Sequence, residues 1–547
     1  MPFAPVHLHK IAINAACRMH ALVGGFHRRR ARLFDDELLL RDGHDSKVDA
    51  CALIAGEPLP VLAALVAGTH ASPSRRGRFE LACAAFELPP QPSADGEQHR
   101  GRLALHLAET AARLSLLRDL LVPEGLLCVR AEGAARVLAG LLLNALCGAN
   151  QRVAFDPALA HALPLVYRNG ARPVLRSVDA KDPGDDADAE SLERLEHADA
   201  LDSTAATLPD DVRDSVADAA RTAFAGLLDA LPRDATVVLD ADLATLGAVD
   251  VSGRRWFACS SDPTALLAAR KRLVAQPGRA VLCQQLRLGP GRGRHTAREM
   301  ATLVLALFGA EALPLRRGRS AAVIGRLGDT FVFVDAPGAT TTQRTIDWVL
   351  AQRARAGMAQ APTVVLGWRY AADVALRWHR QCEPGLELRA IPPALLPRLA
   401  RGGDLRAWRG TAAFPGLGQP LLAALRRERD GTRERLQVSL RDYVLCAAPG
   451  TAPGGLGAIE FWSIDADFDG VLFRSVWHCA RRDGGEIEPT AELTLPRLAR
   501  TRRVALRLID IHGQRTELAF DLAPSTLLQV CEPNAAYGLE KIAAIAA

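Results

Sequence analysis

The feature that most constrains the fold is an alternation of short apolar runs with longer amphipathic segments. Residues 53–54 and 79–85 are predicted strands, with a helix around 61–65 and a loop at 72–77 between them. Leucines spaced through 103–121 predict an amphipathic helix, closed by the Pro-x-Gly turn at 122–125. A strand at 126–129 and a helix at 134–146 follow. Strands that alternate with helices form a parallel sheet, so the chain is predicted to be an α/β protein.

The pattern continues through the second half of the chain. We expect a helix at 212–231, strands at 236–240 and 255–259, and a helix at 263–273. Runs at 321–324, 330–334 and 363–366, with a helix at 342–355, predict a second, smaller α/β unit. Short runs separated by turns then predict a small β-sandwich, at 459–464, 470–473, 504–509 and 516–522.

The length of 547 residues exceeds the roughly 100 to 200 residues of one domain, so several domains are expected. Residues 179–202 are rich in aspartate and glutamate, which predicts a surface excursion or linker. The predicted division is a basic N-terminal extension at 1–48, an α/β domain at 49–285 with an acidic insertion at about 150–210, a second α/β domain at 286–435, a sandwich-like module at 436–525 and a tail at 526–547.

Composition excludes several classes of protein. No run of about 18 apolar residues occurs, and the arginine-bearing start lacks a signal-peptide core, so we expect a cytoplasmic protein without membrane contact. That start also imitates an organellar transit peptide, although a basic extension is the simpler interpretation. The 11 cysteines form no C-x-x-C pair, and His379 near Cys382 and His478 beside Cys479 lack a second ligand pair, so no metal site is predicted. The net charge of +5 permits contact with nucleic acid.

Several motifs occur in the order found in one enzyme family. LSLLRDLLVPEGLLCV at 114–129 resembles the helix, turn and strand that follow the catalytic motif of β-type adenine-specific and cytosine-amino DNA methyltransferases. LIAGE at 53–57 is similar to the opening of their conserved region. The segment 234–240, with GRRWF at 253–257 and AARKRL at 268–273, is similar to their cofactor strand, turn and closing helix.

The carboxyl half extends the resemblance to about residue 525. LFGAE at 307–311, VVLGW at 364–368 and VSLRDYV at 438–444 look like the tail of large family members, and 462–477 and 508–513 look like their terminal β module. The resemblance implies a Rossmann-like methyltransferase mixed sheet with helices on both faces. It also implies transfer of a methyl group from S-adenosylmethionine to adenine N6 in DNA, as in restriction–modification systems.

The family's catalytic motif is degenerate in this chain. The enzymes use an acidic or amide residue, two prolines and an aromatic side chain that stacks on the extruded base. The ungapped match here is 85–88, where Phe86 would stack and Glu87 would accept from the amino group, and a shift of three places supplies Pro89 and Pro90. Neither register reproduces the full motif, and an ordinary proline-rich loop is the alternative.

The cofactor motif is degenerate as well. Family glycines let the backbone approach the methyl donor after the first strand, beside the position of Asp240. The corresponding stretch starts at Asp242 and retains one glycine, Gly247, while side chains at 244 and 246 would crowd the approach. Ser260 replaces the acid that receives the ribose hydroxyls. Asp262 lies two residues further on, although its place before a proline favours a helix N-cap.

Four other features give weaker signals. Arg130-Ala131-Glu132 stands where the family has His-x-Asp, and the recognition region, at 150–210, is short and acidic and would repel phosphate. DADFDG at 465–470 imitates a calcium loop, but its twelfth position is Val476, so a turn is expected. GPGRGR at 289–294 lacks the Lys-Ser/Thr ending of a phosphate loop and is interpreted as a flexible basic loop.

The sequence therefore predicts a catalytically impaired or inactive methyltransferase-fold protein, a pseudoenzyme that serves as scaffold or partner of an active methyltransferase or another protein subunit. One alternative is an active, divergent DNA adenine methyltransferase that uses Glu87 or Asp240 with Phe86. The other is a nucleic-acid or protein binding module built on the terminal β domain and the 289–294 loop. S-adenosylmethionine is the cofactor if the protein is active, and none is expected otherwise.

Overall fold

The computed structural model of the chain describes residues 31–41, 49–68, 73–88, 96–153, 164–170, 224–240, 243–288, 296–314, 321–371, 385–392, 418–445, 455–482, 485–511 and 513–524, and the single positions 374, 395, 399, 414 and 416. The chain divides into two compact units. Unit 1 comprises Met1–Asp35, Ser46–Ser261 and Gly278–Pro290, and unit 2 comprises Asp36–Asp45, Asp262–Pro277 and Gly291–Ala547. The predicted acidic stretch at 179–202 and the basic loop at 289–294 lie outside the described residues.

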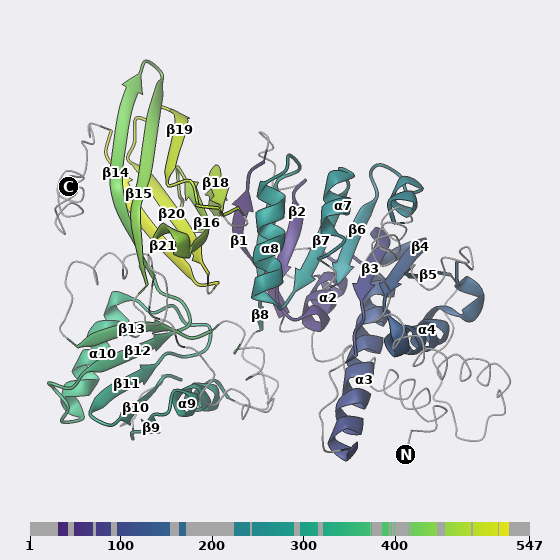
Figure 1. Ribbon diagram of the computed structural model, residues 1–547, viewed down its shortest axis with the longest axis horizontal. Helices are drawn as coiled ribbons and strands as arrows, with labels where there is room; N and C mark the ends of the chain where they lie inside the picture. Colours follow the sequence, from purple (N-terminus) through teal and green to yellow (C-terminus); the bar gives the residue numbers. More distant parts are fainter. Residues whose placement is uncertain are drawn as a thin grey trace. The chain divides into compact units, whose positions relative to one another are not determined.

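Unit 1 is built on a largely parallel sheet, as the strand and helix alternation predicted (Figure 1). Its strand order is β1-β8-β2-β7-β6-β3-β4-β5, and only β5 of those after β8 runs antiparallel to its neighbour. The strands are β1 (Ala31–Leu39), β2 (Cys51–Ala55), β3 (Phe79–Ala85), β4 (Leu121–Arg130), β5 (Leu165–Arg168), β6 (Thr236–Asp240), β7 (Arg255–Ser260) and β8 (Val281–Leu288).

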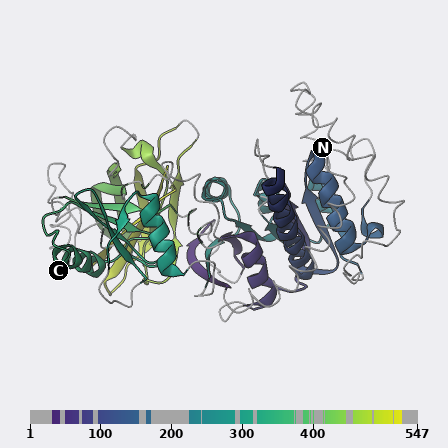
Figure 2. The same cartoon turned by 90° about the horizontal axis from the view of Figure 1, so that it is seen from below.

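Helices cover both faces of this sheet, as the predicted fold class requires. The helices α2 (Pro58–Ala67), α3 (Gly96–Leu120) and α4 (Gly133–Cys147) share one buried apolar cluster with residues of β2, β3, β4, β6 and β7, and α3 contacts both α2 and α4 (Figure 2). Side chains alternate along a strand, so Trp256 points to the face opposite Phe257 of that cluster. There its indole nitrogen donates to Asp250 of α7 (Leu246–Val251) at 3.0 Å. A short η1 helix (Ala149–Gln151) follows α4.

The segment 122–125, predicted as a turn between helix and strand, is instead a bulge inside β4. The strand therefore begins at Leu121 and not at the expected residue 126. Phe79 pairs with Leu121 and Leu81 pairs with Leu126, so β4 contains extra residues at this point. Asn169 fills the bulge: its side-chain nitrogen donates to the carbonyls of Leu121 and Val122, and its backbone N–H donates to Gly125 at 2.8 Å. The bulge therefore depends on a residue that follows β5.

Unit 2 contains the predicted second α/β unit. Its sheet has the order β13-β12-β11-β10-β9, in which β11, β12 and β13 are parallel and β9, β10 and β11 are antiparallel. The elements are β9 (Glu311–Ala312), β10 (Val323–Leu327), β11 (Thr330–Val334), β12 (Thr363–Gly367) and β13 (Leu386–Ala390), with α9 (Ala297–Leu307) and α10 (Gln343–Arg355). The helix α8 (Pro263–Val274) also belongs to unit 2.

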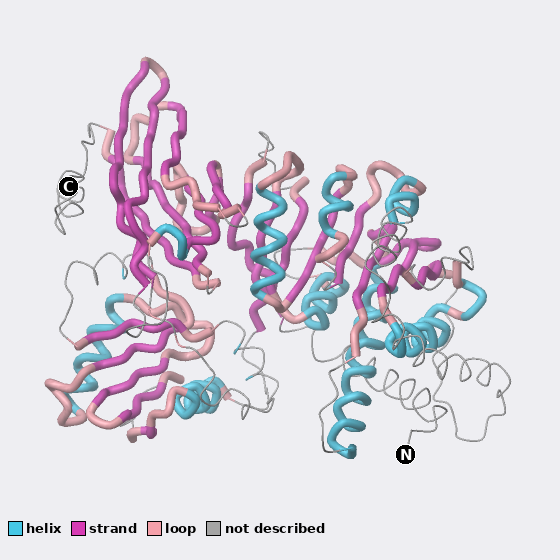
Figure 3. The backbone as a smooth tube through the Cα atoms, viewed as in Figure 1, coloured by secondary structure: helices cyan, strands magenta, loops and turns pink. Residues whose placement is uncertain are grey.

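The end of the described chain consists almost entirely of strands, and it forms the predicted sandwich (Figure 3). One sheet contains β14 (Gly418–Asp430), β15 (Arg433–Leu445) and β19 (Thr490–Pro496), and the other contains β18 (Trp477–Ala480), β16 (Ile459–Asp465), β20 (Arg502–Asp510) and β21 (Arg515–Leu522). Both sheets contribute to one buried cluster. The expected strand at 470–473 is wrong in its bounds, because β17 spans Phe473–Ser475 and pairs with Glu37–Leu39. A short η3 helix (Leu456–Ala458) precedes β16.

A buried ion network, the Glu37 cluster, lies in unit 2. Glu37 is fully buried and receives Arg270 at 2.6 Å and Arg507 at 2.7 Å. Burial by itself would raise the pKa of the Glu37 carboxyl, but the charges of Arg270 and Arg507 lower it below its ordinary value. The cluster also contains Asp36, Arg515 and Glu517.

In the parts of the chain that the structure describes, no helix combines the length and apolar character of a membrane span.

We expect Glu37→Gln to lower the free energy of unfolding by about 3 to 5 kcal/mol, because it leaves buried guanidinium groups without a counter-charge. The matched control is Glu387→Gln, whose carboxylate is 56% exposed beside Arg389 and should matter by about 1 kcal/mol or less. Urea denaturation measures both values. Equal losses in the two variants would contradict a buried Glu37 cluster.

The Glu37 cluster also predicts a pH dependence. The folded-state pKa values of Glu37 and Glu517 lie below their ordinary value of 4.5, so their contribution is present above that pH and is lost as the pH falls. Denaturation curves between about pH 6 and about pH 3 should therefore show a steeper loss of stability for the wild type than for Glu37→Gln. Parallel curves would count against this assignment.

Candidate functional site

The sheet of unit 1 has one point where its connections change direction. After β3 the chain continues to β4 on one side, and after β6 it continues to β7 on the other, while β3 and β6 are parallel neighbours (Figure 1). Open α/β sheets bind ligands at the carboxyl ends of strands at such a point. We refer to the carboxyl ends of β3 and β6 as the β3/β6 edge, and it is there that Phe86 and Asp240 were predicted as site residues.

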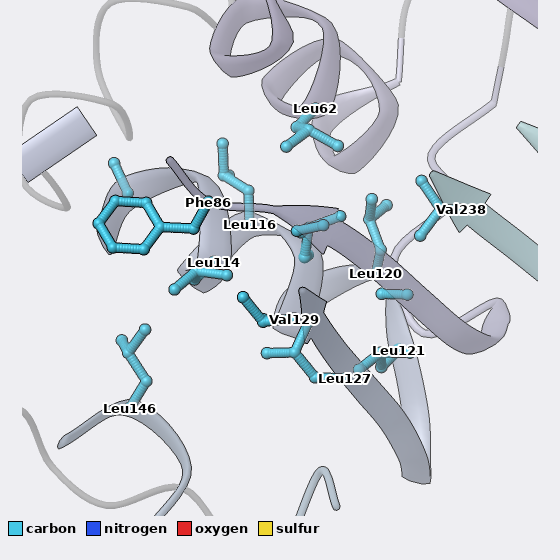
Figure 4. Close-up of a cluster of buried hydrophobic side chains, with 14 of the residues drawn as sticks. Leu62, Phe86, Leu114, Leu116, Leu120, Leu121, Leu127, Val129, Leu146 and Val238 are labelled. Atoms are coloured by element: carbon cyan, nitrogen blue, oxygen red, sulfur yellow. The ribbon is translucent and has the colours of Figure 1, made fainter. Parts of the chain in front are cut away.

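The residue after β3 belongs to the hydrophobic core. Phe86 is 3% exposed and lies in the cluster with Leu114 and Leu116 of α3 (Figure 4). Its ring stacks on His106 with centroids 5.6 Å apart and an angle of 17° between the planes. In this position the Phe86 ring covers apolar surface of its own chain and does not present a face to an external base.

The next residue is oriented outward. Glu87 is exposed, and its backbone carbonyl lies 2.7 Å from Nε2 of His106. Pro89 and Pro90 lie outside the described residues. Catalytic use of Phe86, Glu87 and the two prolines stays a prediction.

The acid at the end of β6 is engaged in a buried ion pair. Oδ2 of Asp240 lies 2.8 Å from Nε of Arg113, with the two side chains 1% and 18% exposed, and Oδ1 receives the Cys259 thiol at 3.8 Å. Burial by itself would lower the pKa of the Arg113 guanidinium, but the Asp240 charge and hydrogen bond raise it above its ordinary value. Both carboxylate oxygens of Asp240 therefore have partners within unit 1.

The segment after Asp240 is apolar where it is described. Leu243 and Leu246 are 7% and 2% exposed, and Asp242 lies outside the described residues. Gly247 lies within α7, where an added Cβ would meet nothing within 4 Å. This glycine therefore belongs to a helix and not to the turn that follows β6.

The remaining predicted positions have structural partners. Ser260 is buried at the end of β7, and its carbonyl accepts from Gly56 at 2.9 Å. Oδ1 of Asp262 accepts from the backbone N–H of Thr264 at 3.0 Å, which confirms the expected N-cap of α8. Glu132 is exposed and directly precedes α4, without a capping bond from its side chain.

The calcium-like loop is a set of turns, as expected. Asp465 accepts from the backbone of Asp467 and Arg474, Asp469 accepts from the backbone of Val471 and Leu472, and Asp467 pairs with Arg500. The described residues contain no cluster of acidic, histidine or cysteine side chains that would hold a metal ion.

Among the described residues of the β3/β6 edge, the end of β6 offers S-adenosylmethionine no open carboxylate acceptor. The acceptor at the end of β6 is held by Arg113, and the described part of the following turn places leucines inward. Sequence reasoning missed Arg113 and His106, which come from the predicted helix before β4. Because Arg113 stands beside the leucines of that helix, the sequence could have indicated that its side chain faces the interior. Nothing local, however, identifies an aspartate 127 residues away as its partner.

No protein-family model matches the chain. No curated protein matches it either. Among solved structures, a protein of Thermus thermophilus named as a candidate DNA modification methylase is 16% identical over 43% of this chain and 99% of its own, with a TM-score of 0.25. Its complex with S-adenosyl-L-methionine gives 15% identity and a TM-score of 0.25, and OgpA of Akkermansia muciniphila gives 12% identity over 20% and 28% of the two chains, with a TM-score of 0.14. Likenesses this weak assign neither function nor ligand.

We expect Arg113→Ala to lower the free energy of unfolding by about 3 to 5 kcal/mol, since it leaves the Asp240 carboxylate buried without its counter-charge. The control is Arg76→Ala, because Arg76 pairs with Asp119 of α3 but is 49% exposed, and should cost about 1 kcal/mol or less. Denaturation of Arg113→Ala, Asp240→Ala and the double variant should give a coupling energy of about 1 to 3 kcal/mol. Additive losses would show that the two side chains do not interact.

Proposed function

We propose that this protein is a catalytically impaired or inactive relative of the S-adenosylmethionine-dependent DNA adenine methyltransferases, and that it acts as a scaffold or as the partner of an active enzyme. The motifs along the sequence support the family, and the residues of the β3/β6 edge support the impairment. The single observation that carries the proposal is the buried pair between Asp240 and Arg113.

The pair opposes binding of a methyl donor. A ribose or amino group that took the place of Arg113 would leave a guanidinium inside the protein, at a cost of about 3 to 5 kcal/mol. Since each 1.4 kcal/mol is a factor of ten, this cost lowers affinity by about two to four powers of ten. The core position of Phe86 acts in the same direction on the target base, because stacking on an extruded adenine requires the ring to leave its contacts with α3.

The scaffold role follows from what is retained. The apolar cluster of unit 1 joins α2, α3 and α4 with residues of strands β1 to β7, which supports a retained fold beside an altered site. A protein that keeps its fold without the reaction is suited to act in assembly, as a scaffold or as a partner subunit.

Isothermal titration of the full chain with S-adenosylmethionine tests this proposal. We expect no binding at micromolar concentrations, because the Asp240 acceptor is occupied. Binding with a micromolar dissociation constant would overturn it, and would favour the active, divergent methyltransferase that uses Phe86 with Glu87 or Asp240.

Transfer of radiolabelled methyl groups to DNA is the second measurement. We expect none above a protein-free control. Methylation that is lost in Glu87→Ala and kept in Glu132→Ala would also refute the proposal. These two acids are matched, because both are exposed and each follows the end of a neighbouring parallel strand, β3 or β4.

A further inference from the structure

Arginines gather at the amino-terminal edge of the unit 1 sheet, opposite the β3/β6 edge. Arg78 directly precedes β3, Arg255 opens β7, and Arg75 lies before the turn that leads into β3. The two parallel strands flank β6 and therefore begin at the same edge. We call Arg75, Arg78 and Arg255 the arginine triad.

An aromatic ring holds two members of the triad. The guanidinium carbon of Arg75 lies 4.4 Å from the centre of the Phe257 ring, and that of Arg255 lies 5.4 Å from it. Phe257 is itself fixed, since it is 4% exposed and meets Phe79 edge-on at 5.4 Å. A guanidinium that stacks on a ring keeps its N–H groups available for in-plane hydrogen bonds.

Two members of the triad, Arg75 and Arg78, lack an acidic partner in the part of the chain that the structure describes. Within the described ranges, neither Arg75 nor Arg78 forms an ion pair or a side-chain hydrogen bond, and Nε of Arg75 is a buried donor without an acceptor. Burial and the charges of Arg255 and Arg78 lower the pKa of Arg75. The neighbouring Arg76, by contrast, donates to Asp119 at 2.8 Å.

We propose that the arginine triad binds a phosphate group. Arginine presents a planar fork of donors that matches phosphate oxygens, and an anion would offset both the crowding of like charges and the missing acceptor of Arg75. The group is either a phosphodiester of a nucleic acid or a free phosphate or pyrophosphate moiety. This site goes beyond the proposed function and does not depend on it, because it uses the opposite edge of the sheet.

The test compares two triple variants of the full chain with equal loss of charge. R75Q/R78Q/R255Q removes the triad, and R326Q/R355Q/R435Q removes three exposed arginines of unit 2. The probes are a fluorescein-labelled single-stranded DNA, inorganic phosphate and pyrophosphate. We expect the triad variant to bind at least about tenfold more weakly to the probe that the wild type binds, and the control to change by less than about twofold.

The separate arms identify the source of the phosphate. A nucleic-acid site gives DNA binding whose logarithmic salt dependence becomes shallower by about 2 in the triad variant, because up to three phosphate contacts are lost. A small-anion site gives thermal stabilisation of the wild type by phosphate or pyrophosphate, without DNA binding and without any shift in the triad variant. Equal weakening in both triple variants, or binding of none of the probes, would overturn the proposal.

A second variant distinguishes loss of binding from loss of folding. R75K/R78K/R255K keeps the charge but loses the forked donors, so we expect phosphate or DNA affinity to fall by about fivefold or more. Unchanged affinity in this folded variant would also refute the triad as the binding site.

Discussion

Unit 1 is organised around one buried ion pair, in which Arg113 of α3 reaches the carboxylate of Asp240 at the end of β6. A charge at that depth is tolerated only when it is matched, so the pair fixes where α3 lies over the sheet. Further side-chain contacts of α3 are consistent with this position of the helix. Three of its other polar side chains bond to separate parts of the unit: His106 to the carbonyl of Glu87, Arg118 to the carbonyl of Leu146 and Asp119 to Arg76. The helix thereby contacts the chain at the ends of β3 and β6, through His106 to Phe86 and through Arg113 to Asp240.

Arginine has two contrasting environments in this protein. In unit 2, Arg427 and Arg502 enclose the buried carboxylate of Glu434, and Arg507 meets both Glu37 and Glu517. Each of these buried cations has an acidic partner, as the cost of burying an uncompensated charge demands. Arg75 differs from these arginines, since its guanidinium lies over the Phe257 ring and no acidic side chain of the described residues pairs with it.

Much of the fold could be predicted from the sequence because its central strands are short, apolar and bounded by turns. The run at 79–85 has the same bounds as β3, and 236–240 has those of β6. The strand β14 could not be predicted in this way, because the charged residues in its second half are typical of an exposed segment. In the structure, however, the side chain of Arg427 in this half points inward and bonds to Glu434. The positions of the candidate site residues followed from the strand ends, whereas their partners did not. Arg113 and Asn169 act across the fold at distances that no local pattern encodes.

The Glu37 cluster has a consequence for how the chain is synthesised. Glu37 is synthesised well before its partners, since Arg270 follows 233 residues later and Arg507 follows 470 residues later. A carboxylate destined for the interior must therefore stay hydrated until the segment that carries Arg507 has been translated. Unit 2 cannot close around it one segment at a time, and a chain that stops between Arg270 and Arg507 carries a buried strand with only one of these two counter-charges.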